Sequence, residues 1–297
     1  MAVIRLIAFI VIDRSGAAVP FPIAADPHSR NSIKMTLLSS LSALVAIAAV
    51  AHSPAHSTEL VIGAPSELAD CIEGLSSAFL AGDKSDRLRF VIAPSAGLYE
   101  KIAAGEPIDV YMSSHMGLQA QMLSDGKMVY NSWTMYATGR LVLWTADKRF
   151  DVTKGLGLLS EPAVKKIATV NANSAYLMPT LAVFDRVGLL DRSASLRTDS
   201  GSMQEAIKMV QAGKAQVAIL SYETVLASAM RGIGKYYLIP ESFYKDALPG
   251  HAAVVTVHGA STPLAYRFIQ FLKTPQAQAI MIPKGFMKPP PGSVDVR

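Results

Sequence analysis

From residue 58 onward, short runs of apolar residues alternate with longer segments in which apolar side chains recur every three or four positions. A run of the first kind, such as Leu60–Ile62, is typical of a buried β-strand. The second spacing, as in Glu67–Leu80, predicts an amphipathic helix. Strands that alternate with helices favour parallel pairing in a sheet covered on both faces. The pattern therefore predicts an α/β fold.

The expected elements follow one another to the end of the chain. Further strands are expected at 89–92, 109–112, 141–144, 167–170, 217–220 and 253–257. Further helices are expected at 98–103, 116–123, 177–187, 203–212, 263–272 and 275–282. No linker rich in proline or glycine divides this region, which two lobes joined by more than one chain crossing would explain. We expect residues 58–137 and 251–297 to form the first lobe and residues 138–250 the second.

The N-terminal region has a different character. Met35–Ala51 contains no charged residue, a lysine precedes it, and small residues follow at the positions that precede a signal cleavage site. We expect 35–57 to be a signal peptide that exports the protein to the periplasm, and 1–34 to be an over-extended N-terminus. An uncleaved anchor is the alternative, because a spanning helix needs about 17 residues or more.

Composition narrows the classes of function. The chain has 297 residues, of which 51% are hydrophobic and 17% charged, so it is long enough to bury large cores. The formal net charge of +5 is small and dispersed, which argues against a nucleic-acid partner. The single cysteine excludes a disulfide scaffold and a multi-cysteine metal site.

Nothing in the sequence argues for an enzyme. The patterns of a phosphate-binding loop, a dinucleotide fingerprint and a nucleophile elbow are absent. His115, His251 and His258 lack the spacing of a helical metal site, and we expect them to be surface or hydrogen-bonded polar residues.

Small polar loops follow three of the expected strands. They span 63–66, 93–97 and 171–176, and contain Ser66, Ser95 and Ser174 respectively. Because ligands bind at the carboxyl ends of strands in open parallel sheets, we expect these loops to face one gap. Hydroxyl groups and free amides at helix N-termini can hold an oxyanion without a cationic side chain. Helix capping by the same serines is the alternative.

The same loops bear on which oxyanion binds. They contain no aspartate, and we expect the side chain of Glu67 to point along the first helical turn, away from the gap. A carboxylate would repel a fully deprotonated dianion but would accept the proton of hydrogen phosphate. Phosphate is therefore the less favoured ligand.

Three segments, two of which overlap these loops, resemble the sequences of a known family. They are LVIGAPSEL at 60–68, SAGLYEKIAAGEPIDVYMS at 95–113, and FLKTPQAQA at 271–279 with Gly285-Phe286 after it. With these segments, the chain from Glu59 to about Phe286 resembles the periplasmic molybdate-binding proteins of ABC transporters. The resemblance implies a two-lobed periplasmic-binding-protein fold. Each lobe would hold a mostly parallel sheet flanked by helices, with the ligand cleft between the lobes.

The resemblance also implies a ligand and a partner. The expected ligand is molybdate, or also tungstate, which a monomeric protein without a cofactor would deliver to the membrane permease of an ABC transporter. Molybdenum would be present only within the oxyanion, without side-chain metal ligands.

Site residues follow from the resemblance by position. It implies ligand contacts from the hydroxyls of Ser66 and Ser95 and from the backbone amides of Tyr176 and Met203. Ser221 stands where many members have a tyrosine, with Tyr222 next to it, so the fifth contact departs from the family pattern.

Other classes of function stay open. The same fold can bind another oxyanion or a small organic anion, and it can serve as an enzyme or a sensor. A structural envelope protein would bind no ligand at all.

Overall fold

The computed structural model describes residues 59–82, 85–172 and 174–293. The predicted signal peptide and the region 1–34 lie outside the described residues. All described residues belong to the compact unit His56–Arg297. Within these ranges, no helix is long and apolar enough to cross a membrane.

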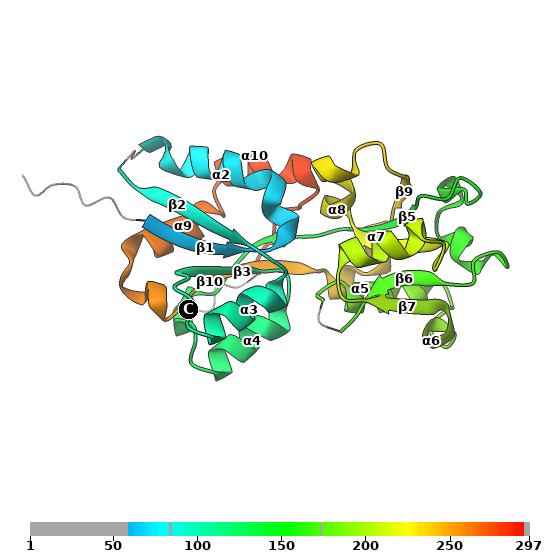
Figure 1. Ribbon diagram of the computed structural model, residues 1–297, viewed down its shortest axis with the longest axis horizontal. Coiled ribbons are helices and arrows are strands. Elements are labelled where there is room, and N and C mark those ends of the chain that lie inside the picture. Colours follow the sequence, from blue (N-terminus) through cyan, green and yellow to red (C-terminus); the bar gives the residue numbers. More distant parts are fainter. Residues whose placement is uncertain (1–58, 83–84, 173, 294–297) are drawn as a thin grey trace, which may run out of the picture. The chain divides into compact units, whose positions relative to one another are not determined.

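The first of two sheets has five strands in the order β2-β1-β3-β10-β4 (Figure 1). Its strands are β1 (Glu59–Ala64), β2 (Arg87–Ile92), β3 (Val110–Ser113), β4 (Thr134–Thr138) and β10 (Gly250–Val255). Strand β1 pairs in parallel with β2 and β3, whereas β10 is antiparallel to β3 and β4.

Helices cover both faces of the first sheet. They are α2 (Ile72–Phe79), α3 (Ser95–Ala103), α4 (Met116–Ser124), α9 (Pro263–Phe271) and α10 (Pro275–Met281). Helices α2 and α10 lie on one side of the sheet, and α3 and α4 on the other (Figure 1). Because side chains alternate along a strand, Leu60 and Ile62 of β1 enter one apolar core and Val61 enters another.

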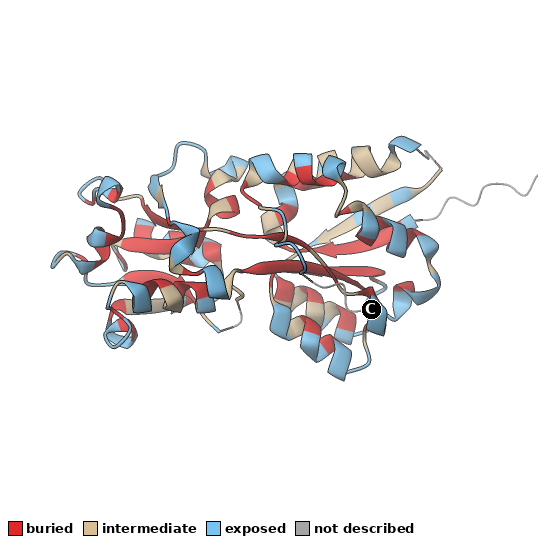
Figure 2. Ribbon diagram, turned by 180° about the vertical axis from the view of Figure 1, so that it is seen from behind, coloured by how far each residue is buried: buried red, intermediate tan, exposed pale blue. Residues whose placement is uncertain are grey.

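The second sheet also has five strands, in the order β7-β6-β8-β5-β9. Its strands are β5 (Leu141–Thr145), β6 (Ile167–Val170), β7 (Arg197–Ser200), β8 (Val217–Ser221) and β9 (Lys235–Leu238). Helices α5 (Leu177–Arg186), α6 (Ser193–Leu196), α7 (Met203–Gln211) and α8 (Tyr222–Leu226) accompany it. Figure 2 shows that the central strands of both sheets are buried, while many helical residues are exposed.

Short 3₁₀ helices complete the described elements. They are η1 (Ser66–Cys71), η2 (Leu80–Gly82), η3 (Tyr130–Ser132), η4 (Val152–Ser160), η5 (Ser228–Met230), η6 (Glu241–Phe243), η7 (Lys245–Ala247), η8 (His258–Ser261) and η9 (Ile282–Lys284). The segment η1 provides the first turns of the helix that the sequence predicts at 67–80.

The predicted α/β fold with two helix-flanked sheets is confirmed. Each sheet is mixed, but four of its five strands run in the same direction, so the expectation of mostly parallel sheets is confirmed. In each sheet the strand that the chain enters directly from the other sheet, β5 or β10, runs against its neighbours.

The chain crosses twice between the sheets. Strands of the first sheet come from 59–138 and 250–255, and those of the second from 141–238. The lobe boundaries 58–137, 138–250 and 251–297 stay a prediction.

Candidate functional site

A cavity of about 160 Å³ lies where loops at the carboxyl ends of strands from both sheets meet. We call it the serine cavity, because five serines contribute to its wall. Its lining consists of Ser66, Glu67, Pro94, Ser95, Ala96, Ser114, Val170, Asn171, Ser174, Gly201, Ser202, Met203 and Gln204. The strand-end loops thus meet around one gap.

Two α-helices begin at the serine cavity. Helix α3 starts at Ser95, and helix α7 starts at Met203. The N–H groups in the first turn of a helix have no acceptor within the helix, and the helix dipole places partial positive charge there. Ser202 caps α7, because its Oγ accepts the N–H of Glu205 at 3.1 Å. Both helix starts therefore favour negative charge in the cavity.

The hydroxyls of Ser66 and Ser95, which follow strands of the first sheet, do not cap a helix. Neither η1 nor α3 has a side-chain cap, although Ser66 and Ser95 are their first residues. The Oγ of Ser95 accepts the N–H of Ser114 at 3.3 Å, which leaves the hydroxyl proton of Ser95 to donate. The capping alternative therefore does not account for these two serines.

The predicted ligand contacts separate into two groups. Ser66, Ser95 and Met203 line the serine cavity together. The amide of Tyr176 donates to Ser174 Oγ at 3.3 Å, and Tyr176 is not among the lining residues.

Ser221 also lies outside the lining. Its Oγ is 2.7 Å from Thr224 Oγ1 and caps α8 by accepting the Thr224 amide. The neighbouring Tyr222 ring packs against Tyr236 and under the guanidinium of Arg140.

Glu67 lines the serine cavity, contrary to the expectation that it points away. It is half-buried, and no other ionisable side chain occurs among the described residues of this lining. Burial raises the pKa of the Glu67 carboxyl, and the nearby Glu223 acts in the same direction. The Glu67 backbone N–H and His251 oppose this rise. The site thus contains an acid that sequence analysis did not include.

A second cavity, of about 110 Å³, adjoins the first. Both share Ser66, Glu67 and Gln204, and the second is also lined by Asp70, Glu223, Thr224 and Lys284, among others. Glu67 therefore lies on the wall of two cavities. Among residues 59–293, as far as they are described, no group of three or more histidine, cysteine or acidic side chains could hold a metal ion.

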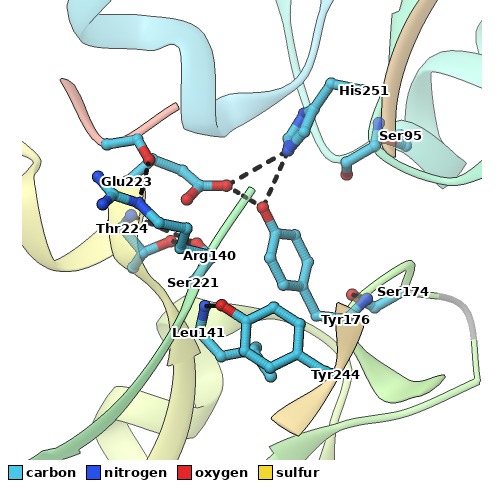
Figure 3. Close-up of polar contacts among 12 residues, drawn as sticks. Ser95, Arg140, Leu141, Ser174, Tyr176, Ser221, Glu223, Thr224, Tyr244 and His251 are labelled. Carbon is cyan, nitrogen blue, oxygen red and sulfur yellow. Dashed lines mark hydrogen bonds and ion pairs between the residues drawn. The ribbon is translucent and has the colours of Figure 1, made fainter. Parts of the chain in front are cut away.

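A buried polar cluster, Tyr176–Glu223–His251, lies beside the cavities (Figure 3). All three side chains have 2% exposure or less. The Tyr176 hydroxyl donates to Glu223 Oε1, and His251 Nε2 lies 3.3 Å from the same oxygen. Tyr176 and Glu223 accompany the second sheet, whereas His251 belongs to β10 of the first. The cluster therefore connects the two sheets, and its Tyr176 follows the loop that contains Ser174.

The other histidines also have polar partners. His115 caps α4, and its Nε2 lies 3.3 Å from the carbonyl oxygen of Ala172, which follows β6. His258 Nδ1 lies 2.8 Å from Asp109 Oδ1. These contacts agree with the expectation of surface or hydrogen-bonded polar residues.

One further contact links the sheets. Asp70 Oδ2 accepts hydrogen bonds from the amide and the hydroxyl of Ser228, both at 2.7 Å. Asp70 belongs to η1 and Ser228 to η5, so this pair ties elements on either side of the second cavity.

Comparison with known proteins identifies relatives of this chain. The family described as "Bacterial extracellular solute-binding protein" matches residues 60–287. The molybdate-binding protein ModA of Rhodobacter capsulatus is 27% identical over 199 residues, which cover 67% of this chain and 76% of ModA.

Solved structures show the same fold. The periplasmic molybdate-binding protein of Azotobacter vinelandii superposes with a TM-score of 0.64 at 23% identity, covering 77% of this chain and 99% of that one. The sulfate-binding protein SubI of Mycobacterium tuberculosis gives a TM-score of 0.61 at 19% identity, over 79% of this chain and 88% of SubI.

Proposed function

Because the chain belongs to the bacterial extracellular solute-binding proteins, we propose that it binds molybdate or tungstate in the serine cavity. We further propose that it is exported to the periplasm, acts as a monomer without enzymatic activity or cofactor, and delivers the anion to an ABC permease. The observation that carries the ligand assignment is a cavity walled by hydroxyls and helix N-termini, in a chain whose relatives include named molybdate-binding proteins.

The chemistry of the lining suits a tetrahedral dianion. Molybdate is fully deprotonated near neutral pH, so each of its oxygens accepts hydrogen bonds and none donates. Serine hydroxyls and free amides donate without adding a cation, and they hold the anion by direction and number of bonds. Lysine and arginine do not occur in the described part of this lining.

We assign donors in two groups. Ser66 and Ser95 donate through their hydroxyls, and Met203 through its backbone amide, since all three line the cavity. The Tyr176 amide and the Ser221 hydroxyl remain proposed contacts. To reach the ligand, each would exchange its present bond, to Ser174 or to Thr224.

Thermal unfolding with molybdate, tungstate, sulfate and phosphate in parallel tests the proposal. A ligand that binds only the folded protein, supplied at about 100 times its Kd, stabilises it by roughly 2.7 kcal/mol. We expect this stabilisation with molybdate or tungstate. Stabilisation by sulfate or phosphate alone would instead support the alternative of another oxyanion, and no shift with any anion would refute an oxyanion receptor.

A double variant tests the site itself. Ser66→Ala with Ser95→Ala should remove the shift, while the unliganded protein still unfolds cooperatively, at a temperature lowered only by the loss of the Ser114 to Ser95 hydrogen bond. Ser77→Ala is the matched control, because Ser77 is exposed on α2 and does not line the cavity. If the double variant bound the anion as tightly as the wild type, the binding site would have to lie elsewhere in the protein.

A further inference from the structure

We propose that Glu67 determines which oxyanion the serine cavity accepts, by donating a hydrogen bond when neutral and repelling a fully deprotonated anion when ionised. This inference rests on the proposed function, because it concerns the ligand of the same cavity. It adds a specificity-determining carboxyl to a site otherwise built from neutral donors.

The position of Glu67 carries the inference. It follows Ser66 in η1, is half-buried, and is a lining residue of both the serine cavity and the second cavity. No other ionisable side chain is found in the described lining of the serine cavity. A charge change at the wall of this cavity between acidic and alkaline conditions must therefore come from Glu67.

The groups around Glu67 come from several elements. Glu223 of α8, His251 of β10 and Tyr136 of β4 all interact electrostatically with it. Asp70 of η1 and Lys284 of η9 line the second cavity together with it.

These neighbours partly compensate one another, and burial is the largest influence on the carboxyl. Burial and Glu223 disfavour its ionisation, while its backbone N–H and His251 favour it. The net effect raises the pKa of Glu67 from its ordinary value, which moves its titration toward neutral pH.

The two protonation states recognise different ligands. A neutral carboxyl donates its O–H to an oxyanion, as a serine does, whereas a carboxylate only accepts. Molybdate and sulfate carry no proton near neutral pH, so an ionised Glu67 repels them. Hydrogen phosphate carries one, and an ionised Glu67 accepts it.

Linkage gives the direction of the pH effect. A dianion that selects the protonated carboxyl takes up a proton on binding whenever Glu67 is ionised in the free protein. Above the Glu67 pKa, the apparent Kd for molybdate therefore rises by up to about tenfold for each pH unit. Phosphate binding does not follow this rise, so the preference for molybdate over phosphate falls with pH.

Calorimetric titration of the wild type with molybdate and with phosphate, from about pH 6 to about pH 9, tests the proposal. Repeating each titration in buffers of different ionisation enthalpy measures the protons taken up. We expect the wild type to take up protons with molybdate at the upper end and to bind it more weakly there. Glu67→Gln should bind molybdate with a nearly constant Kd, and more tightly than the wild type at about pH 9.

Glu73→Gln is the matched control, because Glu73 is exposed on the following helix and lines neither cavity. It should follow the wild-type pH profile. A wild type that binds molybdate without proton uptake at any pH overturns the role of Glu67, and so does a Glu67→Gln variant that keeps the wild-type profile. The wild-type measurement decides the matter even if the variant does not fold. A wild type that binds no anion instead refutes the proposed function.

Discussion

The Tyr176 hydroxyl lies 2.9 Å from Nε2 of His251, although 75 positions separate the two residues in sequence and they accompany different sheets. Both side chains are almost fully buried, and both meet Glu223 Oε1. Glu223 Oε2 and His251 Nδ1 have no hydrogen-bond partner among the described residues. Burying a carboxyl with few hydrogen-bond partners costs free energy of folding. Removing one of the remaining partners of Glu223 would add to this cost.

Tyr176→Phe should therefore destabilise the protein. The change removes the hydroxyl and leaves Glu223 and His251 with one partner fewer, at a cost of about 1–3 kcal/mol in the free energy of unfolding. Urea unfolding measures the loss. Tyr130→Phe is the control, since Tyr130 is 62% exposed, and we expect its change to stay within about 0.5 kcal/mol. Equal stability of the two variants would show that the cluster contributes nothing.

Gly139→Ala should disturb the same cluster from the other side. A methyl group at Gly139 would collide with the Tyr176 hydroxyl and lie 3.0 Å from Glu223 Oε1. Because Tyr176 follows the loop that lines the serine cavity, we expect both a lower unfolding temperature and weaker anion binding. Gly157→Ala is the control, because the space around Gly157 is open. If Gly139→Ala behaved like Gly157→Ala, the close packing at the crossing would be irrelevant to binding.

Asp70→Ala should remove the contact between η1 and η5 beside the second cavity. The two hydrogen bonds from Ser228 lower the pKa of Asp70, so their contribution is present above the ordinary aspartate pKa. It is lost as pH falls through the depressed pKa of the folded protein. At neutral pH we expect a few-fold faster ligand dissociation in stopped-flow experiments.

Ser228→Ala and the double variant complete a cycle with Asp70→Ala. The double variant should dissociate ligand no faster than Asp70→Ala alone, because both changes remove the same contact. Additive effects would show that the two residues act independently.

Cys71 should resist thiol reagents in the folded protein. It is fully buried, and burial raises the pKa of its thiol to about 12, so the reactive thiolate is scarce. We expect reaction with a disulfide reagent only after denaturation. Rapid reaction of the native protein would indicate that the first sheet and its helices open readily.

Much of the site could be predicted because it depends on local sequence. Met203 was expected only from the family resemblance, because it comes shortly after β7, whose sequence is polar. Ser66 and Ser95, in contrast, each follow an apolar strand and begin a helix, and the strand ends of an α/β fold meet at one edge. These positions need only the order of the elements, which the apolar pattern supplies.

The orientation of Glu67 could not be predicted in the same way. We expected the first turn after Ser66 to be α-helical, but η1 is a 3₁₀ helix with about three residues per turn. Successive side chains of a 3₁₀ helix lie about 120° apart around the axis, against about 100° in an α-helix. The expected α-helical geometry therefore did not apply to Glu67, which is among the residues that line the cavity.

Edge strands and distant contacts were missed for other reasons. Strand β7 has the polar sequence RTDS, which lacks the apolar run of a central strand. Strand β9 has the sequence KYYL and lies at the sheet edge with mostly exposed side chains. The contact between Tyr176 and His251 depends on how α5 and β10 pack, which no local pattern specifies.

Only Gly139 and Arg140 separate β4 from β5, and the Gly139 amide donates to Pro249 at 2.8 Å, next to the returning strand β10. The two chain segments that connect the sheets therefore lie side by side and are joined to each other by a hydrogen bond. Because the connection is so short, a rotation of one sheet relative to the other would have to occur mainly about the backbone φ and ψ angles of Gly139 and Arg140. Glycine offers the widest range of these, but its free side faces the Tyr176 hydroxyl. Any side chain added at residue 139 would therefore have to displace this tyrosine, which leaves glycine as the residue that fits the crossing.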